Sequence, residues 1–135
     1  MRSSFKRFLG KHLRLLYQVI YPQRTHQSTM NQQMLAQMEK RGDSLSKARE
    51  VVHWIYFKTE SGRNKFEAEL IGKGFIVKAK DFDKGYGNFP FKLVISREDK
   101  VGWNEIDNYT LELWKLANQY DGDYDGWEAA IFGDK

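Results

Sequence analysis

Three aspartates near the C-terminus have the spacing of calcium ligands. Asp121, Asp123 and Asp125 alternate along YDGDYDGW and are followed by Gly126, as in the first half of a calcium-binding helix–loop–helix loop. That loop also needs a bidentate glutamate at its twelfth position and a second helix after it. The twelfth position here is Phe132, three residues before the last residue. We therefore expect no calcium site, and we expect the aspartates to cap and solvate a turn.

The remaining reactive residue types show no catalytic pattern. The chain has no cysteine, which excludes disulfides, thiolate metal ligands and cysteine nucleophiles. His12, His26 and His53 are scattered without ligand spacing. The serines, histidines and acids have no nucleophile–base spacing, and no phosphate-binding or dinucleotide fingerprint is present. Acidic pairs such as Glu98 and Asp99 lie in predicted turns, where solvated loops are the expected role. We predict a protein that is not an enzyme and that uses no metal or cofactor.

Positive charge is concentrated at the N-terminus. Residues 1–24 hold six lysines and arginines and no acid, which gives +6 there and −2 for the remainder of a chain whose total is +4. Apolar residues in this segment recur at intervals of three and four, as in an amphipathic helix. Charges interrupt the apolar run, so neither a signal peptide nor a membrane span is predicted. Two interpretations stay open: a helix that packs on the domain, or a surface helix that contacts anionic lipid, nucleic acid or an acidic partner through Lys6, Arg7, Lys11 and Arg14.

Residues 25–135 are predicted to form one α+β domain. With 41% hydrophobic and 15% aromatic residues, the chain is long enough to fill one core. Polar residues 23–31 are interpreted as a linker that leads into a short helix at about residues 30–41, which ends at Gly42. A methionine at every fourth position of this helix favours a core-facing stripe.

From residue 51 onward, strand and helix patterns alternate. The run VVHWIYF is β-branched and aromatic, which is typical of a strand that is buried on much of both faces. The predicted elements are a strand at 51–57, a helix that begins after Thr59 or Ser61 and ends at Gly72–Gly74, strands at 75–80 and 89–96, a helix at 103–120 and a last strand from Asp123 to Phe132. This order predicts a ferredoxin-like sandwich, in which two helices cover one face of a four-stranded antiparallel sheet.

That topology places the first strand at the centre of the sheet. Its alternate residues Val52, Trp54 and Tyr56 then point away from the two helices and need a cover, which the N-terminal helices or a partner could supply. In the turn before the last strand, we predict Gly122 as the left-handed residue that follows the helix and Gly126 as a bulge or close backbone approach.

A nucleic-acid motif is matched in part by KGYGNFPF, residues 84–91. This stretch agrees with the RNA-recognition octamer at its first four positions and its eighth, and IYF at 55–57 occupies the place of the companion motif. The fifth position, where the motif stacks a base, is Asn88, and a proline follows two residues later. RNA binding on the aromatic sheet face, through Tyr56 and Tyr86, is therefore the second hypothesis for function.

Four stretches between residues 34 and 132 carry a family resemblance. They are GDSLSKAREVVHWIYF, GKGF, FKLVISR and LANQYDGDYDGWEAAIF, in which YDGW is the most specific piece. Together they resemble the RraB family, regulator of ribonuclease activity B. The resemblance implies a small cytoplasmic bacterial protein of α+β sandwich fold that is not an enzyme, binds ribonuclease E and inhibits RNA processing by that enzyme.

The first hypothesis for function is therefore a regulatory protein that acts by protein–protein contact, with ribonuclease E or a related enzyme as its partner. Members of the family are acidic, and acidic inhibitors complement a basic RNA-binding surface. Here only the −2 body can do so, since residues 1–24 carry +6. A membrane-associated adaptor is the third hypothesis. The candidate partner or family-motif residues are Trp54, Tyr56, Tyr124, Asp125, Gly126 and Trp127.

Overall fold

The computed structural model describes the chain from residue 23 to residue 133, so the predicted basic helix at residues 1–24 lies almost wholly outside the described residues. The described elements are α2 (Gln23–Lys40), β1 (Arg49–Phe57), α3 (Glu60–Glu69), β2 (Ile76–Phe82), the short 3-10 helix η1 (Lys84–Tyr86), β3 (Phe91–Asp99), α4 (Trp103–Gln119) and β4 (Gly122–Ala129). The strands form one antiparallel sheet in the order β2–β3–β1–β4. This topology confirms the predicted ferredoxin-like sandwich.

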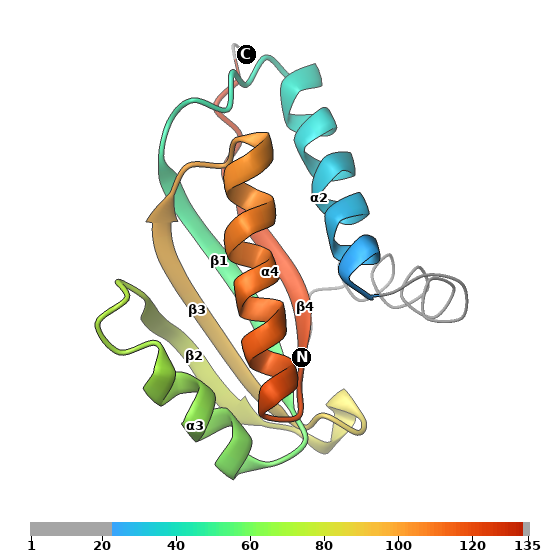
Figure 1. The fold of residues 1–135 in the computed structure, drawn as a ribbon, viewed down its shortest axis with the longest axis vertical. Helices are drawn as coiled ribbons and strands as arrows, with labels where there is room; N and C mark the ends of the chain where they lie inside the picture. The colour runs from blue at the N-terminus through green and yellow to red at the C-terminus, as the bar shows by residue number, and fades with distance from the viewer. Residues whose placement is uncertain (1–22, 134–135) are drawn as a thin grey trace.

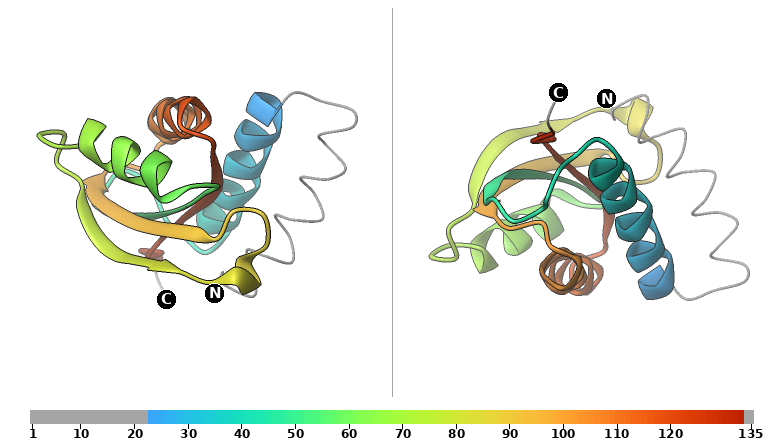
Figure 2. Two further views of the ribbon diagram at one scale, coloured as in Figure 1. Left: turned by 90° about the horizontal axis from the view of Figure 1, so that it is seen from below. Right: turned by 90° about the horizontal axis from the view of Figure 1, so that it is seen from above.

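The two helices of the repeat pack on one face of the sheet. Figures 1 and 2 show α3 and α4 on the same side, with α2 beside α4 near the edge strand β4. The predicted centre of the sheet is correct, because β1 pairs with β3 on one side and with β4 on the other. Alternate residues of β1, such as Val51 and Ile55, are buried under the helices.

The core divides into two clusters along the sheet. One lies around α3 and the end of α4, where Ile55, Phe57, Phe66, Leu93 and Leu113 meet. The other lies between α2, α4 and β4 and contains Leu35, Met38, Val51, Val101, Ile106 and Trp127. Each large apolar side chain buried in this way contributes about 1.5–3 kcal/mol. The second cluster is what joins α2 to the sandwich.

Helix α3 begins where the sequence predicted. Thr59 is its N-cap, and the Thr59 hydroxyl accepts a 2.9 Å hydrogen bond from the backbone N of Gly62. Position 62 has no room for a side chain, because a Cβ on Gly62 would lie 2.3 Å from the carbonyl oxygen of Tyr120. The start of α3 therefore packs directly against the end of α4, and the two helices are fixed relative to each other.

The predicted linker at residues 23–31 is wrong, because these residues form the first half of α2. The helix buries a stripe made of Gln27, Asn31, Leu35 and Met38, of which the first half is polar. Sequence periodicity misses such a stripe, since only apolar residues are counted. Of the three methionines, Met38 alone is fully buried, so the expected methionine stripe is only partly correct.

The end of α2 and the turn before β4 use left-handed residues. Gly42 follows α2 with φ 93°, and its N–H donates to the carbonyl of Glu39, as predicted for a helix stop. At the second turn the predicted residue is wrong: Asp121 has φ 56°, while Gly122 does not lie in the left-handed region. Aspartate tolerates this conformation better than most residues. Gly122 is needed for space, because a Cβ there would lie 2.5 Å from the Phe57 ring.

The predicted irregularity at Gly126 is confirmed. Trp54 pairs with Gly126, and the next residue of β1, Ile55, pairs with Tyr124, so Asp125 is an extra residue in β4. Gly126 has φ 146°, a conformation that favours glycine. The bulge allows Tyr124 and Trp127, three positions apart, to point into the same core.

Candidate partner-binding face

The sheet has one surface that the described helices leave uncovered, which we call the open face. It lies opposite α3 and α4 (Figure 2). Because side chains alternate along a strand, the residues between the buried core positions of each strand point to it. The open face contains Val52, Trp54 and Tyr56 of β1, Val94 of β3 and Ile76 of β2.

Exposure on the open face is uneven. Val52 and Trp54 are half-buried, and Ile76 is 58% exposed. Tyr56 is fully buried, and the ring of Tyr86 packs edge-on against it with the ring centroids 5.3 Å apart. The Tyr86 hydroxyl donates to the Asp81 carboxylate at 3.1 Å, which fixes this arrangement. Contact with a partner on this face is therefore open to Val52 and Trp54 but blocked at Tyr56.

The same packing bears on the RNA-recognition motif. Tyr86 lies in η1, ahead of β3, instead of on the strand, and its ring packs edge-on against Tyr56. The ammonium group of Lys92 lies 5.4 Å from the Tyr86 ring centroid. The two tyrosines through which the RNA hypothesis predicted base stacking thus contact each other, and nothing in this geometry favours that hypothesis.

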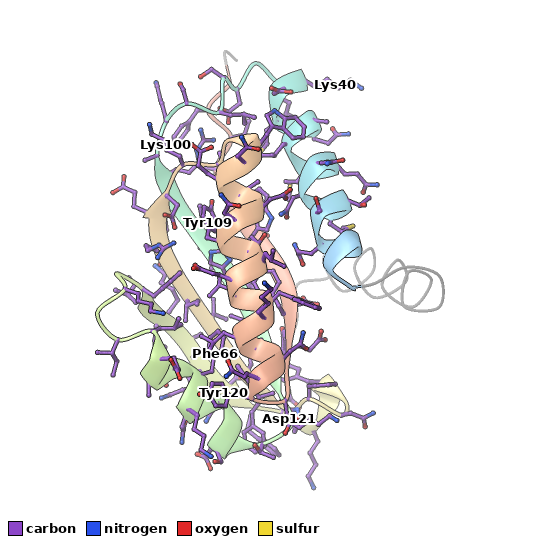
Figure 3. All side chains as sticks on the ribbon, viewed as in Figure 1. Lys40, Phe66, Lys100, Tyr109, Tyr120 and Asp121 are labelled. Carbon is purple, nitrogen blue, oxygen red and sulfur yellow. The ribbon has the colours of Figure 1, made fainter. Side chains whose placement is uncertain are left out.

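Carboxylates line the β4 side of the open face. The half-buried Asp123 and Asp125 flank the buried Tyr124, and the exposed Glu128 follows the buried Trp127. Asp121, labelled in Figure 3, lies in the turn between α4 and β4 and is exposed. We call these four acids the acidic edge.

This arrangement also explains the calcium-like spacing. Asp121 belongs to a turn, and Asp123 and Asp125 belong to an edge strand, so the three aspartates do not form a loop between two helices. Within residues 23–133, no group of three or more His, Asp or Glu side chains is placed to hold a metal ion.

The aromatic residues of YDGW are buried. Tyr124 and Trp127 are each 3% exposed, and Gly126 is buried between them. The Tyr124 hydroxyl lies 2.7 Å from Nδ1 of His53, whose ring also packs edge-on against Tyr109. Burial raises the pKa of Tyr124 well above its ordinary value, so its hydroxyl stays protonated at neutral pH.

His53 acquires a structural role that its isolated position in the sequence did not indicate. The alternation of VVHWIYF could have shown its burial, because His53 lies on the same strand face as Val51 and Ile55. Its contact with Tyr124, 71 residues later, could not have been found from spacing.

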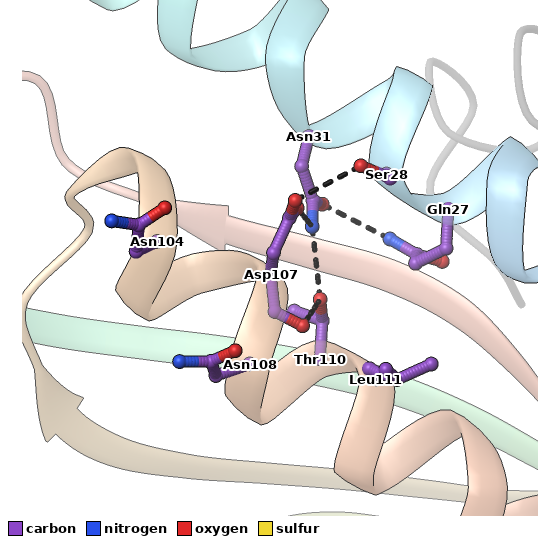
Figure 4. Close-up of a pocket in the computed structure, with 8 residues that line it drawn as sticks. All are labelled: Gln27, Ser28, Asn31, Asn104, Asp107, Asn108, Thr110 and Leu111. Atoms are coloured by element: carbon purple, nitrogen blue, oxygen red, sulfur yellow. Dashed lines mark hydrogen bonds between the residues drawn. The ribbon is translucent and has the colours of Figure 1, made fainter.

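A polar network joins α2, α4 and β4, as Figure 4 shows for the two helices. Asn31 Nδ2 donates to Asp107 Oδ1 at 2.8 Å and to Thr110 Oγ1 at 2.9 Å, and Ser28 Oγ donates to Asp107 Oδ2 at 2.9 Å. Trp127 Nε1 donates to Asn31 Oδ1 at 2.7 Å. Ser28, Asn31, Asp107 and Thr110 border a pocket of about 250 Å³. Because the polar atoms are bonded to one another, the network fixes the position of α2 on the domain.

A buried ion pair fixes the segment that follows β4. Asp43 and Arg49 pair at 2.5 Å, with side-chain exposures of 1% and 2%. The backbone N of Phe132 donates to Asp43 Oδ2 at 2.9 Å, and Arg49 donates to the carbonyl of Ala130 at 2.9 Å. The hydrogen bond from Arg49 holds the pKa of the Asp43 carboxyl well below its usual range. The end of β4, and with it the acidic edge, is thereby held in place.

The candidate contact residues thus fall into three groups. Trp54 and Asp125 lie on the open face and its acidic edge; Tyr56, Tyr124, Gly126 and Trp127 are buried. Whether a partner contacts any of them stays a prediction. The predicted polyanion contacts Lys6, Arg7, Lys11 and Arg14 lie outside the described residues.

The fold and this face define a ferredoxin-like α+β protein whose sheet has a surface that the described helices leave uncovered and that acids border. The sequence model of the family described as RraB, regulator of ribonuclease activity B, matches residues 28–129. The chain belongs to the RraB family, which confirms the resemblance carried by YDGW and the three other stretches. No curated protein sequence matches the chain. Within the part that the structure describes, no helix combines the length and the apolar character needed to cross a membrane.

Proposed function

We propose that this protein is a non-catalytic regulator that binds a ribonuclease in the cytoplasm and inhibits it by protein–protein contact, with ribonuclease E or a related enzyme as the target. The observation that carries the proposal is the family match over residues 28–129, since that family is described as regulating ribonuclease activity. The rest of the argument concerns which surface makes the contact.

The acidic edge is the surface best suited to a ribonuclease. An enzyme that binds RNA must present cationic side chains to the phosphate backbone. A surface that carries Asp121, Asp123, Asp125 and Glu128 complements such a site in charge. The regulator then occupies the surface of the enzyme to which RNA binds.

The apolar part of the open face supplies the second component of the contact. Val52 and Trp54 lie on the central strand β1, next to β4, and remain half-exposed. Interfaces combine an apolar centre that contains aromatic anchors with a polar rim. We infer that Trp54 is the anchor and that the acidic edge is the rim.

The structural roles of the buried titratable groups support the proposal that the regulator is not an enzyme. Tyr124 and His53 contact each other inside the core, and Asp43 pairs with Arg49 under the C-terminal segment. Each pair is buried and stabilises packing.

The experiment is isothermal titration calorimetry, in which the full-length protein is added to purified ribonuclease E. Both proteins are first freed of bound RNA by nuclease treatment. The test variant Asp121→Asn/Glu128→Gln removes two exposed carboxylates of the acidic edge. The matched control, Glu105→Gln/Glu112→Gln, removes two exposed carboxylates from α4. We expect a complex that the control leaves unchanged and that the test variant weakens by on the order of tenfold. Equal affinities for the two variants would remove the acidic edge from the account, and absence of a complex would remove ribonuclease E as the target.

A further inference from the structure

We propose that two copies of this chain join along the outer edge of β2, antiparallel and with Lys80 at the two-fold axis, so that their sheets become one continuous sheet. This dimer does not rest on the proposed ribonuclease target, because β2 and β4, which carries most of the acidic edge, are the opposite ends of the strand order β2–β3–β1–β4.

Strand β2 has an outer edge to which no described strand is paired. Within residues 23–133, β2 pairs with β3 alone, and Figure 1 shows it at the side of the sheet that is remote from α2. All seven of its residues are exposed. Its large apolar side chains are exposed as well: Ile76 by 58%, Val77 by 44% and Phe82 by 51%. Because an edge strand also presents unpaired backbone N–H and C=O groups, this edge is suited to receive another strand.

The pairing with β3 shows which side chains of β2 share a face. Val77 lies opposite Ile95, and Phe82 lies opposite Phe91, with the two phenylalanine ring centroids 4.8 Å apart. Ile95 belongs to the core cluster around α3, and Phe91 packs against that cluster. Val77 and Phe82 are therefore both on the helix-covered side of the sheet.

One register of a β2–β2 pair matches these faces and the chemistry of the side chains. Lys78 is an extra residue, because Val77 and Ala79 pair with consecutive residues of β3, so Lys78 and Ala79 count as one strand position. With Lys80 opposite its own counterpart, Val77 of each copy lies opposite Phe82 of the other, and two apolar pairs form on the same face. Moving the axis by one position in either direction sets Lys80 opposite Val77 or Phe82, a lysine against an apolar side chain.

The lysines of β2 do not prevent this pairing. Lysines on an edge strand normally keep other strands away. Here Lys80 Nζ lies 2.9 Å from Glu67 Oε1 of α3, and Lys78 Nζ lies 3.0 Å from Glu50 Oε2 of β1. Because both ammonium groups bind carboxylates of their own chain, two copies bring neutral ion pairs together instead of isolated cations. The self-complementary apolar pairs then favour a second copy as the occupant of this edge.

The dimer would carry two acidic edges. Its strand order is β4–β1–β3–β2 in one copy, continued by β2–β3–β1–β4 in the other. The two β4 strands, and the acidic edges with them, lie at the far ends of the continuous sheet. The contact between the copies therefore leaves the surface of the proposed function unchanged.

Sedimentation equilibrium of the full-length protein tests the association. We expect the mass to rise with concentration from 16.0 kDa towards twice that value. Val77→Lys places a cation opposite Phe82 at both ends of the contact and should raise the dissociation constant at least about tenfold. The matched control Ile131→Lys makes the same exchange beyond β4, at a residue that is 40% exposed, and should associate like the wild type. A monomer at every concentration, or equal dissociation constants for the two variants, would overturn the proposal.

Single cysteines test the register without relying on the folding of Val77→Lys, because the chain contains no cysteine of its own. In the proposed dimer, the two copies of residue 80 face each other with Cα atoms about 5 Å apart, which a disulfide can span. Residue 76 lies three strand positions from the axis in each copy, so its two copies are about 20 Å apart. We expect mild oxidation to link Lys80→Cys rapidly into a covalent dimer and to leave Ile76→Cys, at an exposed position of the same strand, largely monomeric. Equal rates of linkage at the two positions would overturn the β2–β2 pairing.

Discussion

The indole Nε1 of Trp127 donates a 2.7 Å hydrogen bond to Oδ1 of Asn31, 96 residues earlier in the chain. This bond joins the last strand to the first described helix. Asn31 also donates to Asp107 and Thr110 of α4, so one buried side chain connects α2, α4 and β4. The most specific part of the family motif, YDGW, thus ends on a residue that holds α2 against the sandwich.

Two substitutions of Trp127 should destabilise the domain to different extents. Trp127→Phe keeps a ring and removes one hydrogen bond to Asn31, which we expect to lower the free energy of unfolding by about 1 kcal/mol. Trp127→Ala also removes the buried indole, with an expected loss of about 3–5 kcal/mol. Chemical denaturation measures both. Trp103, which is 41% exposed, is the control, and Trp103→Phe should have little effect. An unchanged unfolding midpoint for Trp127→Ala would refute the structural role.

The Asp43–Arg49 pair should make stability depend on pH. The pKa of Asp43 is lowered in the folded state, so its contribution to stability is complete above the unfolded-state pKa of about 3.9 and is lost as pH falls below that value. At pH 7, Asp43→Asn leaves Arg49 buried without its anion, which should cost about 3–5 kcal/mol. The difference between wild type and variant should shrink between about pH 4 and pH 2. Denaturation series at several pH values measure it, and a constant difference would contradict the prediction.

Gly122 tests the packing at the start of β4. An added methyl group would meet the Phe57 ring at 2.5 Å, so Gly122→Ala should destabilise the fold by about 1–3 kcal/mol. Because Gly122 does not lie in the left-handed region, this cost comes from crowding and not from backbone strain. Asn118→Ala, at an exposed position of α4, is the control and should melt like the wild type. A melting temperature of Gly122→Ala equal to that of the control would refute the close approach.

The sequence predicted those features that depend on local patterns. The alternation in VVHWIYF located β1, and Gly42, Thr59 and Gly126 were placed correctly because turns, caps and bulges select particular residue types. The first half of α2 was missed, since its buried residues Gln27 and Asn31 look like a linker until their partners on α4 are known. Tertiary hydrogen bonds overrode the local pattern there.

The candidate site was predicted less completely than the fold. The sequence predicted Trp54 and Tyr56 on the face opposite the helices as equally available for contact, but Tyr56 is fully buried and packs against Tyr86. The aspartates of the acidic edge were noticed for their ligand-like spacing. Their common orientation became visible only with the bulge at Asp125, which shifts the alternation of β4.

The second hypothesis, RNA binding, is tested by Tyr86→Ala. A tyrosine that stacks a base is worth about 1–3 kcal/mol of single-strand affinity. We expect no loss from this variant at physiological salt, because Tyr86 packs on Tyr56 and any RNA binding should arise from the basic N-terminal segment. Fluorescence anisotropy with a short labelled RNA measures it, and Arg7→Glu/Lys11→Glu/Arg14→Glu is the comparison. Salt-resistant binding that depends on Tyr86 would place RNA recognition first.

The most direct test of the account is the rate at which purified ribonuclease E cleaves a short fluorogenic RNA as the full-length protein is added. Charge complementarity between the acidic edge and the RNA-binding surface predicts a saturable fall in the cleavage rate, relieved by excess RNA. The fall should be weaker with Asp121→Asn/Glu128→Gln than with Glu105→Gln/Glu112→Gln. A cleavage rate that stays constant as the protein is raised to a large molar excess over the enzyme would contradict the account.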